Sequence, residues 1–130
     1  MPEGAHLRIA RPTGDLERVA RMYREGLGFE ELGSFRDHDG FSGVMLGHAG
    51  CGYHLELTSE LGAPSPPRPD PDHLLVFYLP DRAEWEVTCS RMLDAGFAPV
   101  ASHNPYWEAR GRMFEDTDGY RVVLQNTEWP

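Results

Sequence analysis

The sequence has no long apolar run, no secretory signal and little positive charge. No apolar segment approaches the ~18–20 residues that cross a bilayer, so we expect no membrane partner. The first residues carry neither a basic cluster nor an apolar stretch, which favours a cytoplasmic location. The formal net charge of −9 opposes non-specific binding to nucleic acid, which needs a positive surface.

Reactive-site motifs are also missing. Cys51 and Cys89 do not form a C-x-x-C pair, and two such thiols are expected to stay reduced. The sequence contains no G-x-S-x-G, no P-loop and no G-x-G-x-x-G. It therefore lacks the signatures of a serine hydrolase, a P-loop nucleotidase and a dinucleotide-binding enzyme.

Two helices are indicated by apolar spacing and by their end signals. A stripe with helical period runs along residues 15–27, where Asp15 or Thr13 can cap the start and Gly26 or Gly28 the end. The second helix opens at Asp81, with a glutamate three residues later as a capping box, and ends near residues 95–96. Short apolar segments between turn residues predict strands at 7–10, 29–35, 43–46, 52–58, 74–79, 97–101, 111–114 and 120–125.

The order of these elements repeats with a period near 67 residues. Gly52 opens G-Y-H-L-E-L, and Gly119 opens the similar segment G-Y-R-V-V-L. A proline-rich stretch at 59–72, stiff and extended, separates the two copies. We predict one α+β domain spanning residues 1–130, with a first βαβββ module at 5–58, a linker at 59–72 and a second βαβββ module at 73–127. The helices should cover one face of each sheet, and the other faces could curve around a shared cavity.

Two motifs carry a resemblance to a known superfamily. Residues 15–29 contain D-L and end in Y-R-E-G-L-G-F, and residues 114–120 read F-E-D-T-D-G-Y. Together with the duplicated layout, they resemble the vicinal oxygen chelate superfamily of glyoxalases, bleomycin-resistance proteins and extradiol dioxygenases. Thr117 stands where that motif has proline. The resemblance implies the glyoxalase/bleomycin-resistance fold, a small-molecule ligand and a homodimer.

Metal enzymes of this superfamily take one ligand from each of four strands facing the cavity. Carried onto this sequence, those positions are Arg8, Glu56, Leu74 and Val123. Only the glutamate can bind a divalent metal, since arginine is not deprotonated in proteins and the other two side chains have no donor atom. Zinc and iron sites need about three protein ligands. We therefore expect no metal cofactor.

A shift of one residue in the strand that opens the second module gives an alternative. His73 would then point into the cavity, and His6, Glu56 and His73, with His54 nearby, could hold zinc, iron, manganese or nickel. The shift would also turn Leu75, Phe77 and Leu79 into the cavity. The segment is apolar on both faces, so its periodicity does not decide between the two registers.

Without a metal, the charged side chains at the cavity positions require partners of opposite charge. We expect Arg8 and Glu56 to form an ion pair, with Arg121 and His54 nearby, because neither charge tolerates burial alone. Such a pair could orient a polar ligand or simply neutralise itself. In the second half, Tyr106 and Trp107 offer flat surfaces for stacking. The predicted ligand-binding residues are Arg8, His54, Glu56, Val76, Tyr78, Tyr106, Trp107, Arg121 and Val123.

These observations predict a small-molecule-binding protein of the glyoxalase/bleomycin-resistance/dioxygenase type that works without the family's metal. The alternative is a metal-dependent lyase, isomerase or dioxygenase whose substrate carries vicinal oxygens. Whether the protein is an enzyme is open. If it is, Glu56 and His54 are the candidate general bases.

Overall fold

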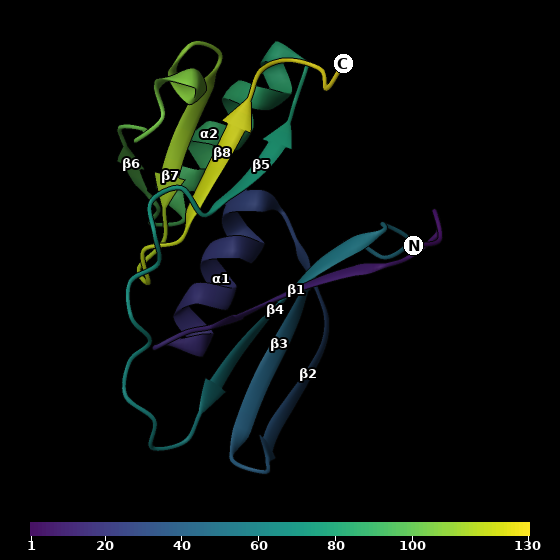
Figure 1. Cartoon of the computed structure of the whole chain (residues 1–130), viewed down its shortest axis with the longest axis vertical. Coiled ribbons are helices and arrows are strands. Elements are labelled where there is room, and N and C mark those ends of the chain that lie inside the picture. Colours follow the sequence, from purple (N-terminus) through teal and green to yellow (C-terminus); the bar gives the residue numbers. More distant parts are fainter. The chain divides into compact units, whose positions relative to one another are not determined.

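A computed structural model describes residues 1–130 and contains two four-stranded mixed sheets, each with one α-helix (Figure 1). In the first sheet the strand order is β1-β4-β3-β2; β1 and β4 are parallel and the other neighbours antiparallel. Its elements are β1 (Leu7–Pro12), α1 (Leu16–Leu27), β2 (Glu30–His38), β3 (Phe41–Gly47) and β4 (Tyr53–Glu60).

The second sheet repeats this order as β5-β8-β7-β6, again with a parallel pair at one edge, β5 and β8. Its elements are β5 (Leu74–Tyr78), α2 (Arg82–Asp94), β6 (Ala98–Val100), the 3₁₀ helix η1 (Pro105–Glu108), β7 (Gly111–Glu115) and β8 (Arg121–Gln125). The predicted α+β class and the repeated βαβββ order are confirmed. No helix combines the length and apolar character that crossing a membrane requires.

Three local predictions need correction. Strand β2 continues to His38 instead of ending near Phe35, because the hairpin turn is tight, with positive φ at Asp37 and Asp39. Strand β4 extends to Glu60, into the segment expected to be linker. The 3₁₀ helix η1 was not predicted, although Asn104 caps it by accepting a hydrogen bond from the Tyr106 N–H at 3.0 Å.

Both helices begin at the predicted aspartates. The Asp15 side chain accepts from the Arg18 N–H at 3.3 Å, and Asp81 accepts from the Glu84 N–H at 2.9 Å. These contacts satisfy amide groups that the first turn of a helix leaves without a partner. Gly28, with φ 71°, supplies the left-handed residue that ends α1.

In the first sheet, odd-numbered β1 residues face α1. The Arg11 guanidinium lies 3.5 Å from the Tyr23 hydroxyl of α1, and Arg11 is paired in register with Leu57. Leu57 therefore lies on the α1 side, while His54 and Glu56 lie on the opposite, helix-free face. The buried apolar side chains of this layer are Leu16, Val19, Ala20, Tyr23, Val44, Leu46, Leu55 and Leu57.

In the second sheet, Trp85 of α2 fixes which face the helix covers. Its indole Nε1–H donates to the Leu124 carbonyl at 2.8 Å, and the Arg112 guanidinium lies 4.8 Å from its ring. Arg112 is paired with Leu124, so both side chains lie on the α2 side. The buried side chains of this layer include Trp85, Cys89, Met92, Phe114, Val122 and Leu124.

The parallel pairs settle the register of β5. Leu74 is paired with Arg121 and Val76 with Val123, on the helix-free face of the second sheet. The one-residue shift that would turn Leu75, Phe77 and Leu79 to this face is not present. His73 precedes the strand, and its N–H donates to the Asp70 carbonyl at 3.0 Å.

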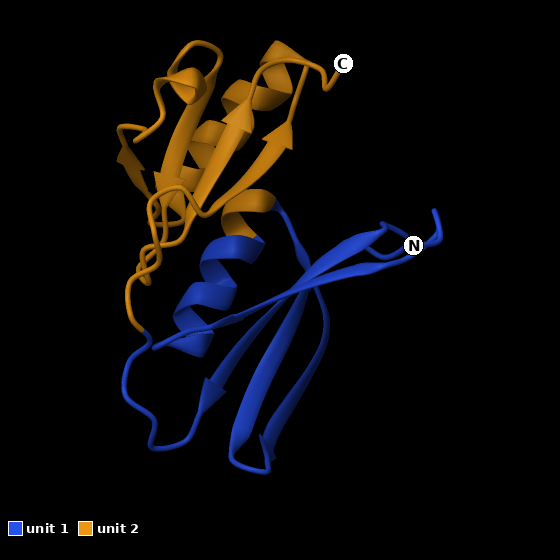
Figure 2. Cartoon of the chain, in the orientation of Figure 1, with its two compact units in different colours: residues 1–24, 28–66 blue, residues 25–27, 67–130 orange.

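The chain divides into two compact units (Figure 2). Unit 1 comprises residues 1–24 and 28–66, and unit 2 comprises residues 25–27 and 67–130. Within unit 2, Arg68 of the proline-rich segment forms an ion pair with Glu115. A Cβ at Gly119, where φ is +97°, would lie 2.8 Å from Cγ of Arg68. The second half of the proline-rich segment is thus held against the β7–β8 turn.

Replacing the cap of α2 tests the local account of the helix start. Asp81→Ala should lower the free energy of unfolding by about 1 kcal/mol, because the Glu84 N–H loses its partner. Asp94→Ala is the matched control at the other end of α2, where a negative charge opposes the helix dipole. Denaturant unfolding measures both variants. Equal losses would show that the cap contributes nothing specific.

Candidate functional site

Four polar side chains meet on the helix-free face of unit 1. Arg8 Nε donates to His54 Nε2 at 2.9 Å, and Arg8 Nη1 donates to Glu56 Oε2 at 3.2 Å. On the other side of the ring, His54 Nδ1 lies 2.5 Å from His6 Nε2. The strands position these groups because Arg8 and His54 are paired in register and Glu56 follows two residues along β4. We call these four residues the His–Arg–Glu cluster.

The hydrogen bonds fix the protonation of His54. Nε2 accepts from a guanidinium, so it carries no proton, and the ring proton of the neutral imidazole is on Nδ1, where it can be donated to His6. Burial lowers the pKa of His54 below 6.5, the charge of Arg8 lowers it further, and so would a proton on His6, while Glu56 opposes them. The cluster therefore contains a neutral imidazole beside an ion pair.

The predicted ion pair between Arg8 and Glu56 is confirmed, but it is not buried. The Arg8 side chain is 50% exposed and that of Glu56 is 14% exposed. Arg121, expected near this pair, is bound inside unit 2: its Nε donates to Glu115 Oε2 at 2.9 Å and its Nη1 to the Ala101 carbonyl at 3.3 Å.

The residues at the four family metal positions do not fit a divalent metal. Arg8 brings a permanent positive charge to the carboxylate of Glu56, the one donor of the set. Leu74 and Val123 have no donor atom. No group of three or more histidine, cysteine, aspartate or glutamate side chains is arranged to hold a metal ion. His6 and His54 do come together in unit 1, whereas His73 belongs to unit 2.

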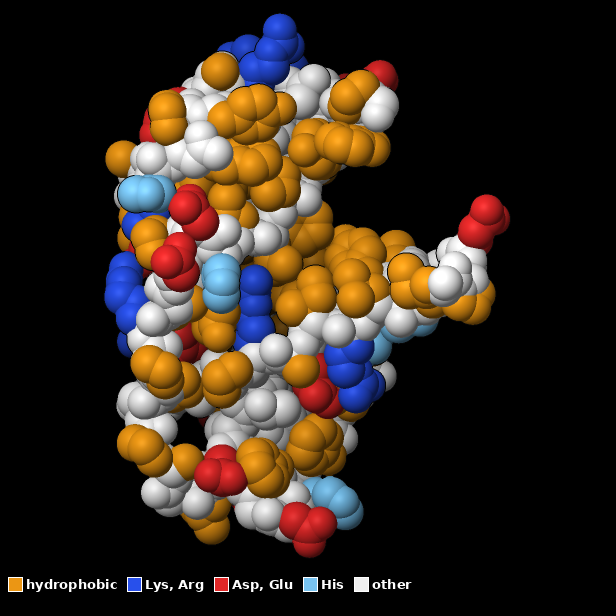
Figure 3. Space-filling view, in the orientation of Figure 1, with side chains coloured by type: hydrophobic (Ala, Val, Ile, Leu, Met, Phe, Trp, Pro, Cys, Tyr) orange, Lys and Arg blue, Asp and Glu red, His pale blue; other side chains and the backbone are white.

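Unit 2 contains a pocket of about 460 Å³ between Tyr78, Tyr106 and Trp129, which we call the aromatic pocket. The rings of Tyr78 and Trp129 are 5.8 Å apart, and Tyr106 and Trp129 are 65% and 75% exposed. Hydrophobic side chains also gather on the surface of unit 2 beside the C-terminus (Figure 3). The remaining lining residues are Ala109, Arg110, Gln125, Thr127, Glu128 and Pro130.

Gln125 gives this pocket an unusual polar group. The residue is 3% exposed, and its Oε1 is buried without a hydrogen-bond partner. A Cβ at position 111 would lie 1.9 Å from this oxygen and 2.7 Å from the Trp107 carbonyl oxygen. Only glycine at position 111 leaves room for the amide. A buried acceptor without a partner costs about 1–3 kcal/mol.

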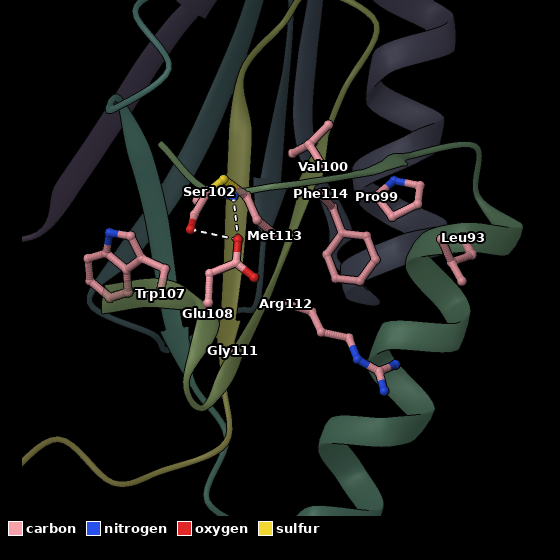
Figure 4. Close-up of a pocket in the computed structure, with 10 residues that line it drawn as sticks. All are labelled: Leu93, Pro99, Val100, Ser102, Trp107, Glu108, Gly111, Arg112, Met113 and Phe114. Atoms are coloured by element: carbon pink, nitrogen blue, oxygen red, sulfur yellow. Dashed lines mark hydrogen bonds between the residues drawn. The ribbon is translucent and has the colours of Figure 1, made fainter. Parts of the chain in front are cut away.

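A second pocket of unit 2, about 320 Å³, lies at the β6–β7 edge beside η1, and we call it the edge pocket (Figure 4). Glu108 lies at its centre, where Oε1 accepts from the Ser102 N–H at 2.8 Å and from its hydroxyl at 2.9 Å. These two bonds lower the pKa of Glu108 and keep it ionised. Its lining residues are Leu93, Pro99, Val100, Ser102, Trp107, Glu108, Gly111, Arg112, Met113 and Phe114.

The structure divides the predicted ligand residues into separate groups. Tyr78 and Tyr106 line the aromatic pocket, whereas Trp107, whose ring lies at 87° to that of Tyr106, lines the edge pocket. Val76 is partly exposed, and Val123 is fully buried.

Sequence reasoning grouped His6 with His54 only in the metal-binding alternative, and it missed Gln125 and Trp129. The strand alternation that selected Val123 also places Gln125, two residues later, on the same face. Trp129 follows the last strand and has no periodic signal.

Comparisons with known proteins agree with this duplicated architecture. Models of the YycE-like N-terminal domain and the YycE-like C-terminal domain match residues 7–58 and 72–126. The YycE protein of Bacillus subtilis (strain 168) is 44% identical over 126 residues, which cover 97% of this chain and 91% of that protein.

Solved structures give the same result. A YycE protein from Bacillus subtilis, of unknown function and grouped with glyoxalase/fosfomycin resistance proteins, matches with TM-score 0.90 and 43% identity over 98% of this chain and 93% of its own. Two more distant structures share the fold at TM-score 0.71. Trypanothione-dependent glyoxalase I of Leishmania major is 22% identical, over 92% of this chain and 84% of its own. The fosfomycin resistance protein FosX of Mesorhizobium loti is 18% identical, over 97% of this chain and 93% of its own.

The identity and coverage of the Bacillus relative, the two matching domain models and the shared fold lead to one conclusion. The chain belongs to the YycE-like family and, through its glyoxalase/bleomycin-resistance fold, to the vicinal oxygen chelate superfamily.

Proposed function

We propose that this protein binds a planar small molecule in the aromatic pocket of unit 2, without a divalent metal. The observation that carries this proposal is the Gln125 amide, whose Oε1 is buried beside the pocket without a partner. A half-turn of the amide about its soft terminal torsion would direct its N–H toward the Trp107 carbonyl and turn Oε1 to the pocket. An N–H or O–H group of a ligand would then satisfy that oxygen.

The rest of the pocket favours a flat ligand. Tyr78, Tyr106 and Trp129 provide rings that stack on planar molecules, and the volume of about 460 Å³ is in the range of small-molecule sites. Arg110, also in the lining, offers a cation to an electron-rich ring or an anionic substituent. Two proteins of the same fold are named for small molecules, fosfomycin and trypanothione, which supports a small-molecule ligand but not its planar shape.

Removing one wall of the pocket should abolish binding with little effect on folding. In a thermal-shift screen of planar aromatic compounds, a ligand at about 100 times its dissociation constant adds roughly 2.7 kcal/mol of stability. Trp129→Ala should lose most of that shift, since it removes a ring that lines the pocket beside Tyr78, and it should spare the fold, since Trp129 is 75% exposed. Phe41→Ala is the matched control, an exposed aromatic of unit 1. A shift that survives Trp129→Ala would place the ligand elsewhere.

The Gln125 amide should support binding more than stability. Gln125→Leu should leave the free energy of unfolding within about 1 kcal/mol of the wild type, because the amide oxygen that it removes has no partner. The same variant should weaken the compounds found in the screen about tenfold, since they lose a hydrogen bond that nothing else supplies. Denaturant unfolding and titration calorimetry give the two quantities. A destabilised variant with unchanged affinity would contradict both statements.

The alternative is a metal-dependent lyase, isomerase or dioxygenase. Because Glu56 is paired with Arg8, we expect elemental analysis of protein purified without chelators to find no stoichiometric zinc, iron, manganese or nickel. Thr58→Ala, on the same strand, is the control for Glu56→Ala. A stoichiometric metal that is lost in Glu56→Ala and kept in Thr58→Ala would establish the metal-dependent alternative.

A second candidate function is proton transfer at the His–Arg–Glu cluster. His54 is held as a neutral imidazole, the form a general base requires, whereas Glu56 is engaged by Arg8. Both ring nitrogens of His54 already have partners, so a substrate would have to displace Arg8 or His6.

The homodimeric state and the cytoplasmic location stay predictions from the sequence.

The pKa of His54 tests the geometry of this cluster. Arg8→Gln should raise it toward 6.5, because a neighbouring positive charge is removed. In the wild type, the unfolded state binds a proton more readily than the folded state. The contribution of His54 to stability is therefore complete above pH 6.5 and is lost as the pH falls toward its folded pKa.

NMR titration of the His54 ring measures this shift. Arg36→Gln is the control, because Arg36 pairs with Glu17 on an exposed part of unit 1. An unchanged His54 pKa in Arg8→Gln would show that the two side chains do not interact in solution.

A further inference from the structure

Three arginines line one polar pocket of unit 2, about 350 Å³ in volume, which we call the arginine pocket. Arg82 comes from the first turn of α2, Arg112 from β7, and Arg110 from the segment just before β7. We propose that this pocket binds the oxyanion group of an organic anion, such as a phosphate monoester. Its remaining lining residues are Trp85, Glu108, Ala109, Gly111 and Asn126.

The concentration of positive charge is unusual for this chain. The net charge is −9, and the sequence contains no lysine, so arginine supplies all of its lysine-plus-arginine count of 12. Three of these arginines share one small pocket. Guanidinium groups stay charged at every relevant pH, and their planar N–H forks match the oxygen spacing of phosphate and carboxylate groups.

Trp85 holds two of the guanidinium groups in place. Their Cζ atoms lie 5.4 Å (Arg82) and 4.8 Å (Arg112) from the centre of its ring. The ring itself is 6% exposed and is fixed by the hydrogen bond from Nε1 to the Leu124 carbonyl. Cations stacked on a rigid buried ring lose little freedom when an anion binds, which favours recognition over loose surface attraction.

Nearby acidic groups offset part of this charge. Arg82 forms an ion pair with Glu86, in which Nε of Arg82 lies 3.0 Å from Oε1 of Glu86. Glu108 also lines the pocket, and its carboxylate, held by two hydrogen bonds from Ser102, brings one negative charge to the three guanidinium groups. No carboxylate forms an ion pair with Arg110 or Arg112.

The edge pocket adjoins the arginine pocket, and away from Glu108 it supplies apolar side chains. Glu108, Gly111 and Arg112 line both. Beyond Arg112, the edge pocket is walled by Pro99 and Phe114 (Figure 4). A ligand with an oxyanion head against the guanidinium groups and a compact apolar body against these side chains fits both surfaces. This chemistry distinguishes the ligand from free inorganic phosphate and from the planar molecules proposed to stack in the aromatic pocket.

The test uses phenyl phosphate as the probe, with inorganic phosphate and benzyl alcohol for comparison. Binding to the full chain is followed at constant ionic strength by ¹⁵N NMR of the three tryptophan indole N–H groups. Phenyl phosphate should shift the Trp85 signal and bind more tightly than either comparison compound. Arg82→Gln and Arg112→Gln should each weaken phenyl phosphate about tenfold, because each removes a charge-assisted hydrogen bond. Arg91→Gln, an exposed arginine of α2 outside the described pockets, should leave the affinity unchanged.

Three outcomes would overturn the proposal. The first is that Arg82→Gln and Arg91→Gln bind phenyl phosphate with equal affinity. Because Arg82 is exposed, its replacement does not threaten folding. The second is that inorganic phosphate binds as tightly as phenyl phosphate, which would show that the apolar side chains add nothing to the affinity. The probe could shift only Trp129, which would assign it to the aromatic pocket. Trp129→Ala should leave phenyl phosphate binding intact, so this site and the proposed function can fail independently.

Discussion

The parallel pairing of β1 with β4 and of β5 with β8 is the constraint on which the candidate sites depend. Side chains alternate along a strand, so this register decides which residues face the helix and which face away. In unit 1 it sets Arg8 beside His54, two residues before Glu56. In unit 2 the equivalent register sets Leu74 beside Arg121 and Val76 beside Val123. The same geometry thus produces a charged cluster in one module and a largely apolar face in the other.

The elements and their order could be predicted because local signals coincide with tertiary ones. Asp15 and Asp81 cap helices whose apolar stripes are buried, so capping and periodicity indicate the same boundaries. The ion pair between Arg8 and Glu56 followed from the cost of isolated charge at adjacent positions. The end of strand β2 was harder to predict, because its last residues are polar and its pairing with β3 is irregular near the turn.

The pockets could not be predicted in the same way, because they depend on segments without periodicity. The 3₁₀ helix η1 separates Tyr106 from Trp107, so two neighbours in sequence line different pockets. Trp129 lies beside Tyr78, and no pattern in the last residues of the sequence indicates this contact. The three arginines of the arginine pocket come from different parts of the chain, and two of them, Arg82 and Arg112, meet at the Trp85 ring.

The close approach of Gln125 to Gly111 also constrains how this protein can evolve. A methyl group at position 111 would overlap the glutamine oxygen and crowd the Trp107 carbonyl, so alanine there requires a shorter side chain or a displaced amide at 125 as well as a shift of the Trp107 backbone. The reverse order is easier, because shortening residue 125 first leaves space that glycine tolerates. The two positions should therefore show epistasis, with substitutions at 111 accepted only in lineages that have already changed 125.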